Sequence, residues 1–266
     1  MKQRVISAVV LLAIALTCIF VSFVTRVIFF GVVGILCAYE YSRGLEKINV
    51  YCAAWVMYVY IAVQAVLALT HCGALSYIAC FTGGIYLAMF SGIVHRKVSG
   101  QGAIYTVAGL AYPGVIYGVM MMISVGSIWD ESLILGAISC WACDSFALFG
   151  GMRFGKHKLA PNVSPNKSVE GSVCGALASM VAGIVIWALP VLPRLSLPVC
   201  VLTALVSSSM GQIGDLAESM IKRMLGLKDF SNLIPGHGGM FDRTDSLMFA
   251  IPTAYLCLLL AQRFVA

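Results

Sequence analysis

Acidic, basic and glycine residues gather in a few segments of a chain that is otherwise strongly apolar. One of these segments is GLKDFSNLIPGHGGMFDRTDS, residues 226–246. Its proline and glycines predict turns and a close approach of the backbone to a ligand. Capping of the following helix explains one acid here, but not both Asp242 and Asp245 beside Arg243 and His237. Because neighbouring carboxylates repel unless a cation lies between them, this pair predicts a cation site.

A second cluster lies just before it, in GQIGDLAESMIKR, residues 211–223. On a helix, its polar side chains fall at positions i, i+3, i+4 and i+7 and share one face; they are Asp215, Glu218, Ser219 and Lys222. That face cannot contact lipid, so it lines a polar cavity or packs against another polar helix. A structural ion pair explains Glu218 with Lys222, but explains Asp215 less well because it lies deepest.

The third cluster is CDSFALFGGMRFGKHKLAPNVSPNKSVEGS, residues 143–172. Asp144 lies ~9 Å below the predicted helix end, at ~1.5 Å per residue. An acid within a membrane span predicts a functional site, with snorkelling or pairing to another helix as the alternative. Basic residues among glycine and serine donors are suited to a phosphate ligand, and lipid-headgroup contact is their alternative role. These basic residues are Arg153, Lys156, His157, Lys158 and Lys167.

Four carboxylates thus predict a site for a hard divalent cation: Asp144, Asp215, Asp242 and Asp245. Oxygen-only ligands suit Mg²⁺, which keeps waters and bridges to substrate phosphates. Zinc is not predicted, because His237 has no Cys or His partners at ligand spacing. A metal and basic side chains supply what phosphoryl or nucleotidyl transfer needs. The sequence has no phosphate-binding G-x-x-x-x-G-K-[ST] loop and no G-x-G-x-x-G turn, so membrane helices and their loops must build the site.

Composition places this site in a membrane protein. Hydrophobic residues make up 61% of the chain and charged residues 11%, and apolar segments of roughly the ~20 residues that cross a bilayer recur along it. Because lipid offers the backbone no hydrogen-bond partners and the apolar segments are continuous, we predict an all-α polytopic fold. Nine spans are expected, at about 5–24, 27–42, 50–70, 73–93, 103–123, 132–150, 172–190, 199–218 and 246–265. The first shows no clear cleavage site and is interpreted as a retained helix.

Charge predicts the orientation of these spans. With the N-terminus in the cytoplasm, 14 of the 17 Lys and Arg residues lie on the cytoplasmic side, and only Arg26, Arg194 and Arg263 lie opposite. The positive-inside rule therefore predicts a cytoplasmic N-terminus and a C-terminus on the other side. The net charge of +6 reflects this orientation, and no nucleic-acid partner is expected. We expect five spans in residues 1–125, and a catalytic region in 126–266 with four spans and two long cytoplasmic loops, 151–171 and 219–245.

The signature SMIKRMLGLKDFSNLIPGHGGMFDRTD, residues 219–245, resembles that of the phosphatidate cytidylyltransferases, or CDP-diacylglycerol synthases, of the bacterial type. GDLAES and FGKHKLAPNVSPNKSVEG, upstream, also resemble them, so the resemblance covers about 140–246. It implies that CTP and phosphatidate give CDP-diacylglycerol and pyrophosphate with Mg²⁺. The reaction would take place at the cytoplasmic face of a bacterial inner membrane, in a homodimer.

The resemblance and the residue patterns together assign roles. Metal binding is expected of Asp144, Asp215, Asp242 and Asp245, with a second or monovalent cation left open. Catalytic roles are expected of Asp215, Lys222, Arg223, Lys228, His237 and Arg243. Substrate binding is expected of Lys156, Lys158, Ser164, Lys167 and Ser219.

Two other functions would use similar residues. A CTP-dependent polyprenol or phytol kinase would share the site chemistry but phosphorylate an alcohol. A transporter also places acids within spans, but typically shows broken helices in paired repeats near the midplane. Here the polar residues crowd one predicted face and the halves show no matching interruptions, which disfavours a transporter. The full KDF…PGHGG…DRTD signature favours the cytidylyltransferase over the kinase.

Overall fold

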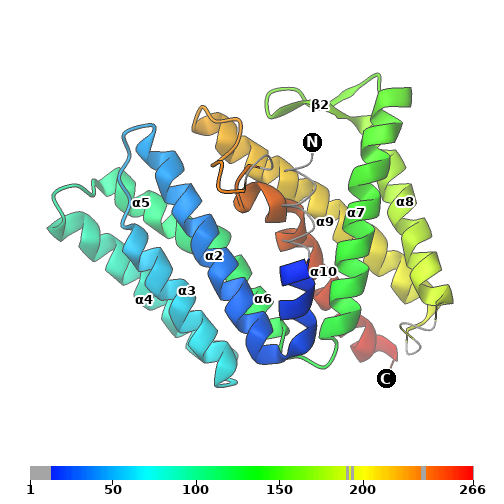
Figure 1. The fold of residues 1–266 in the computed structure, drawn as a ribbon, viewed down its shortest axis with the longest axis horizontal. Coiled ribbons are helices and arrows are strands. Elements are labelled where there is room, and N and C mark those ends of the chain that lie inside the picture. The colour runs from blue at the N-terminus through cyan, green and yellow to red at the C-terminus, as the bar shows by residue number, and fades with distance from the viewer. Residues whose placement is uncertain (1–12, 190–191, 193–194, 235–237, 266) are drawn as a thin grey trace. The chain divides into compact units, whose positions relative to one another are not determined.

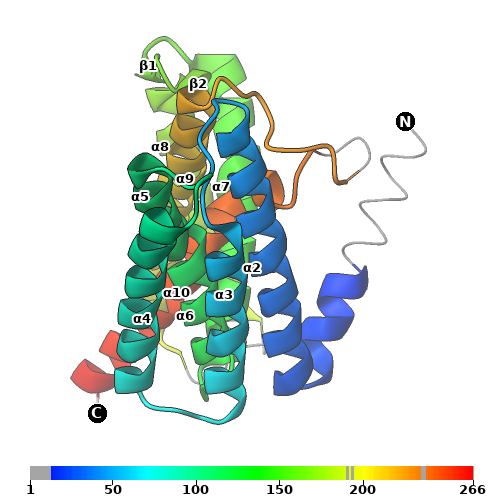
Figure 2. The same cartoon turned by 90° about the vertical axis from the view of Figure 1, so that its left-hand side faces the viewer.

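The computed structural model describes residues 13–189, 192, 195–234 and 238–265, and most of them are helical. The chain forms two compact units, one of residues 1–126 with 225–243 and one of residues 127–224 with 244–266. Figures 1 and 2 show the elements of both. Apolar segments of this length form helices because a helix satisfies its interior backbone groups with its own hydrogen bonds.

The first unit is a set of helices. Its elements are α2 (Phe23–Glu46), α3 (Ala54–Leu69), α4 (Ala74–Val94), α5 (Gly100–Gly109), the π-helical turn η1 (Leu110–Val115) and α6 (Ile116–Ile123). Helix α2 packs against α3 and α6, and α4 packs against α3 and α5. The segment 225–240, which precedes α10, also belongs to this unit.

The second unit carries a small hairpin on a helical bundle. Its elements are α7 (Trp129–Phe154), β1 (Lys158–Ala160), β2 (Ser164–Ser168), α8 (Val169–Ala188), α9 (Leu197–Met224) and most of α10 (Phe241–Val265). Helices α7, α8 and α9 lie side by side, as Figure 1 shows. The two strands pair antiparallel, with Lys158 opposite Ser168 and Ala160 opposite Ser164.

The all-α, multi-pass class is confirmed. Seven helices among the described residues have the length and apolar composition to cross a membrane, and α3 is a shorter apolar helix. The predicted first span begins in residues 1–12, which lie outside the described residues. The count of nine spans and the side on which each terminus lies therefore stay predictions.

Both predicted cytoplasmic loops are shorter than expected. Helix α9 continues to Met224 and α10 begins at Phe241, so the expected loop 219–245 is reduced to 225–240. Helix α9 thus continues past the predicted end at 218 with its polar face, and Gly226, with φ of 67°, follows its end in the left-handed conformation that favours glycine. The loop expected at 151–171 is largely the β1–β2 hairpin, a departure from a purely helical chain.

Small residues let the helices of the second unit approach closely. A Cβ at Gly175 of α8 would lie 2.6 Å from the carbonyl oxygen of Cys143 on α7. A Cβ at Gly214 of α9 would lie 2.5 Å from the carbonyl oxygen of Asp245 on α10. Close packing through small residues is a main source of helix association in membranes. It also holds the backbones that carry Asp215 and Asp245 next to each other.

Gly214→Ala is therefore expected to destabilise the protein, although Ala is the better helix former by about 1 kcal/mol. The added methyl group meets the ring of Phe249 and the backbone carbonyl oxygen of Asp245, and this oxygen cannot rotate away as a side chain can. Thermal unfolding in detergent measures the effect. The matched control is Gly83→Ala in α4, where no atom lies within 4 Å of the added Cβ. If both variants shift the unfolding temperature equally, close packing at Gly214 is not important.

Candidate active site

Asp215 on α9 is at the centre of a polar cluster in the second unit. The Lys167 ammonium, presented by strand β2, forms an ion pair with Asp215 Oδ2, and both side chains are half-buried. The Ser219 hydroxyl, one turn further along α9, donates to Asp215 Oδ1 at 3.4 Å. The predicted helix face and the predicted phosphate-binding loop therefore meet at this carboxylate.

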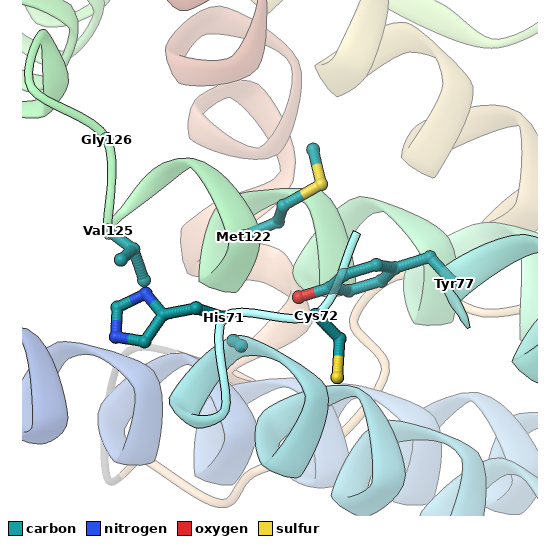
Figure 3. A pocket seen from close by; sticks show the side chains of 7 residues that line it. His71, Cys72, Tyr77, Met122, Val125 and Gly126 are labelled. Carbon is teal, nitrogen blue, oxygen red and sulfur yellow. The ribbon is translucent and has the colours of Figure 1, made fainter. Parts of the chain in front are cut away.

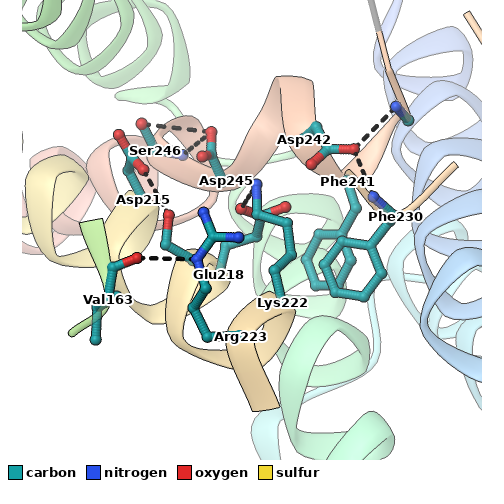
Figure 4. Close-up of polar contacts among 12 residues, drawn as sticks. Val163, Asp215, Glu218, Lys222, Arg223, Phe230, Phe241, Asp242, Asp245 and Ser246 are labelled. Atoms are coloured by element: carbon teal, nitrogen blue, oxygen red, sulfur yellow. Dashed lines mark hydrogen bonds and ion pairs between the residues drawn. The ribbon is translucent and has the colours of Figure 1, made fainter. Parts of the chain in front are cut away.

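The next turn of α9 carries a second ion pair. Lys222 pairs with Glu218, as their i,i+4 spacing predicts; the Glu218 side chain is 0% exposed and that of Lys222 is 12% exposed. Arg223 Nε donates to the carbonyl oxygen of Val163 at 3.2 Å, which joins α9 to the tip of the hairpin (Figure 4). Two contacts thus hold the hairpin against α9: Lys167 extends from the hairpin to α9, and Arg223 extends from α9 to the hairpin.

The hairpin is fixed at its base by the start of α8. Ser168 caps this helix by accepting a hydrogen bond from Gly171 N at 3.1 Å. The Glu170 carboxylate accepts hydrogen bonds from the backbone N of Lys156 at 3.0 Å and of His157 at 3.2 Å, and it contacts His157 Nδ1 at 2.5 Å. Sequence reasoning assigned no role to Glu170, although an acid after a Ser cap is a recognisable signal.

Two further carboxylates of the second unit interact electrostatically with Asp215. Asp144 on α7 also interacts with Lys167, and Asp245 on α10 also interacts with Lys222. Asp245 Oδ1 accepts a hydrogen bond from Ser246 N at 2.7 Å (Figure 4). Three of the four predicted metal-binding acids are therefore electrostatically coupled, with two ammonium groups among them.

The described residues hold no ready-made cluster of three metal ligands. The donor set is nevertheless suited to Mg²⁺, because the acids offer oxygen atoms only. Mg²⁺ commonly takes one or two carboxylates and completes its shell with waters and substrate phosphates. Asp215 and its acidic neighbours fit that mode of binding better than a cage built from protein alone.

Gln212 adds a polar contact deeper in the bundle, which the sequence reasoning missed. Its side chain pairs with the Ser172 hydroxyl, and its Nε2 donates to Ser172 O at 3.3 Å and to Cys143 Sγ at 3.0 Å. Gln212 lies three residues before Asp215, on the same face of α9. An amide within an apolar span was the signal that could have identified it.

The signature segment of the first unit is organised by carboxylates. Asp242 Oδ2 accepts hydrogen bonds from Phe230 N at 3.0 Å and from Gly239 N at 2.9 Å. The rings of Phe230 and Phe241 stack with centroids 4.8 Å apart (Figure 4). Asp242 thus joins Phe230 and Gly239 in the segment before α10, and its role in metal binding stays a prediction.

The remaining predicted residues divide between the two units. Lys156 and Lys158 are exposed and Ser164 is half-buried, all at the hairpin of the second unit. Lys228 and Arg243 are exposed and belong to the first unit. His237 lies outside the described residues. Among the described residues, no contact joins any of these to Asp215.

A separate open pocket lies in the first unit, where the α3–α4 connection meets the end of α6 (Figure 3). None of its lining residues is a predicted site residue. They are Ala68, His71, Cys72, Tyr77, Met122, Val125 and Gly126.

Comparison with known proteins places this arrangement in a family. A sequence model described as the cytidylyltransferase family matches residues 2–261. The phosphatidate cytidylyltransferase of Brucella abortus biovar 1 is 32% identical over 258 residues, which cover 96% of this chain and 92% of the relative. The phosphatidate cytidylyltransferases of Staphylococcus saprophyticus and Staphylococcus epidermidis are 34% and 35% identical over 173 and 164 residues, or 65% and 62% of each chain. Because the family match and the Brucella relative both span nearly the whole sequence, the chain belongs to the cytidylyltransferase family.

Proposed function

We propose that this protein converts CTP and phosphatidate to CDP-diacylglycerol and pyrophosphate. The family membership and the named activity of the relatives support the reaction. The observation that supports a site for this reaction is the ion pair between Lys167 and Asp215, with Ser219 beside it. Asp144 and Asp245 interact electrostatically with Asp215. Both substrates carry phosphate groups. A site that binds them needs acids to hold a metal ion and fixed basic side chains to bind the phosphate oxygens.

The reaction is an in-line displacement at phosphorus. A phosphate oxygen of phosphatidate forms a bond to the α-phosphorus of CTP, and the bond from that phosphorus to the oxygen bridging to the β-phosphate breaks. Pyrophosphate leaves with the electron pair of the broken bond. Little covalent chemistry falls to the protein, so positioning and neutralisation of charge account for most of the catalysis.

Side chains of the hairpin and of α9 supply the positive charge. Lys167 is held by Asp215 and Lys222 by Glu218, so neither ammonium has to be ordered when the substrate binds. Pre-ordered cations bind phosphate oxygens at a smaller entropic cost than free lysines do. Arg223, fixed to the hairpin through Val163, presents a guanidinium at the same end of α9.

We further propose that the acids of the second unit hold Mg²⁺, with Asp215 and Asp245 as principal ligands and Asp144 as an additional one, while metal binding by Asp242 stays a prediction. When bound, Mg²⁺ neutralises phosphate charge and stabilises the leaving pyrophosphate. A second or monovalent cation is compatible with four acids in the signature regions. Acids that otherwise repel one another would gain a counter-ion in this way.

The bacterial relatives and the apolar helices support a location in the bacterial inner membrane. The excess of Lys and Arg in the polar segments supports a site that faces the cytoplasm, where CTP is available. A homodimer is expected from the family resemblance. Mass measurement of the protein in lipid nanodiscs tests that expectation.

The direct test uses purified protein in detergent micelles with phosphatidate, CTP labelled in turn at the α- and γ-phosphates, and Mg²⁺. We expect α-label in CDP-diacylglycerol, γ-label in an equimolar amount of pyrophosphate, and loss of both products with EDTA. Transfer of γ-label to a lipid alcohol would instead identify a kinase. Neither product from folded protein would overturn the proposed function.

A further inference from the structure

Glu40 is an acid in the interior of helix α2, among the apolar residues of a predicted span. Its side chain is 0% exposed. An ionisable group within a span is costly and is retained where it has specific partners. The partners of Glu40 lie about 200 positions further along the chain, in the signature segment of the same unit.

The Glu40 carboxylate accepts three hydrogen bonds from that segment. Oε1 accepts from Ser231 Oγ at 2.6 Å and from Met240 N at 2.9 Å. Oε2 accepts from Phe241 N at 2.8 Å. These groups are all donors, so a carboxylate matches them and a side chain with donors of its own does not.

Two of the donors are the backbone groups at the start of α10. The first amides of a helix have no partner within the helix, and the positive end of the helix dipole favours a negative charge there. Glu40 therefore caps α10 from another helix, although it is far away in sequence. The first turn that it holds contains Asp242 and Arg243, both part of the signature.

The packing around this contact leaves little freedom. A Cβ at Gly239 would lie 2.6 Å from Glu40 Oε2, so this position accommodates only glycine while the carboxylate is in place. Phe241 also contacts Tyr112, with ring centroids 5.3 Å apart. One turn after Glu40 on α2, Gly44 faces Leu225 and Phe230, at the start of the signature loop.

We propose that Glu40 is a positioning residue that holds Ser231 together with Met240 and Phe241 at the start of α10, and thereby orients the first turn of α10, with Asp242 and Arg243, for the reaction. It touches no substrate in this role. The part of the inference that concerns catalysis rests on the proposed function, whereas the anchoring of the loop does not. Misplacement of a catalytic group by about 1 Å is enough to cost roughly 100-fold in rate.

Glu40→Gln tests the proposal with little change in size. The amide has a single acceptor oxygen, so it keeps either the pair of bonds at Oε1 or the bond to Phe241, not all three. Hydrogen exchange of the full-length protein in detergent is expected to accelerate about tenfold at Met240 and Phe241, and not in the other helices. We also expect a roughly tenfold lower kcat/KM for CTP and a higher Mg²⁺ concentration for half-maximal activity.

Glu46→Gln is the matched control, because it makes the same change on the same helix. Glu46 is 39% exposed and pairs with Arg43 at the surface, so exchange and kinetics should equal those of the wild type. Ser231→Ala is a second, milder variant on the loop side. Combined with Glu40→Gln it should add less than its separate effect, because both changes act on one contact.

The outcomes separate the two claims. Unchanged exchange at Met240 and Phe241 in both variants would overturn the anchoring role. A lower yield of active protein with unchanged KM and unchanged Mg²⁺ dependence would show that Glu40 is only structural. If wild-type protein makes no CDP-lipid while the local exchange difference persists, the proposed function fails and the anchor stands.

Discussion

Asp215→Asn is expected to lower the rate of CDP-diacylglycerol formation by about 1,000-fold while leaving the protein folded in the membrane. The amide has nearly the shape of the carboxylate and can still accept from Ser219, so the helix is not disturbed. It lacks the negative charge that pairs with Lys167 and that is proposed to hold Mg²⁺. The loss should therefore appear in the chemical step rather than in the amount of protein.

The measurement is product formation from labelled CTP over a range of Mg²⁺ concentrations. Asp130→Asn is the control, because Asp130 is an exposed acid in the first turn of α7, in the same unit and at the end of α7 opposite the hairpin. It should keep near wild-type activity. If Asp215→Asn also does so with Mg²⁺, Asp215 is not part of the metal site.

The helix face around Asp215 was predictable because it depends on local geometry. The 3.6-residue period alone brings Asp215, Ser219 and Lys222 to one side of α9, and tertiary packing then only has to supply Lys167. The type of chemistry was also predictable, because charged residues are conspicuous in an apolar chain. A contact between a basic loop residue and an acid of this face could be expected. That it joins Lys167 to Asp215 could not be predicted from the sequence.

The hairpin was not predictable in detail. Strand β2 is SPNKS, which contains a proline and shows no alternation of apolar and polar residues, so neither its strand nor its register is apparent from the sequence. The backbone hydrogen bond from Val169 N to His157 O, together with the Glu170 carboxylate, holds it in place. Such contacts depend on where α7 ends and α8 begins, and helix ends are the least certain part of a sequence prediction.

Glu40 shows a different limit. Its position in an apolar span could have marked it as functional, but its partners Ser231, Met240 and Phe241 follow about 200 residues later. No periodicity connects residues at that separation. The structure is needed to show that the acid caps a helix other than its own.

Lys222→Met is expected to destabilise the protein by about 3–5 kcal/mol and to abolish activity. Lys222 pairs with Glu218, whose side chain is completely buried. Breaking a buried ion pair from one side leaves a charge in a low-dielectric environment, and its cost exceeds what the pair contributes when intact. Unfolding in detergent with increasing denaturant measures the stability, and the cytidylyltransferase assay measures the activity.

The double variant Glu218→Gln with Lys222→Met separates the two effects. Removing both charges should recover most of the lost stability, since no buried carboxylate remains to be neutralised. Activity should stay low, because the ammonium that interacts with Asp245 and is proposed to bind phosphate is still missing. Recovery of activity along with stability would mean that Lys222 only neutralises Glu218. Arg43→Met, which breaks an exposed pair with Glu46, should cost less than about 1 kcal/mol and leave turnover unchanged.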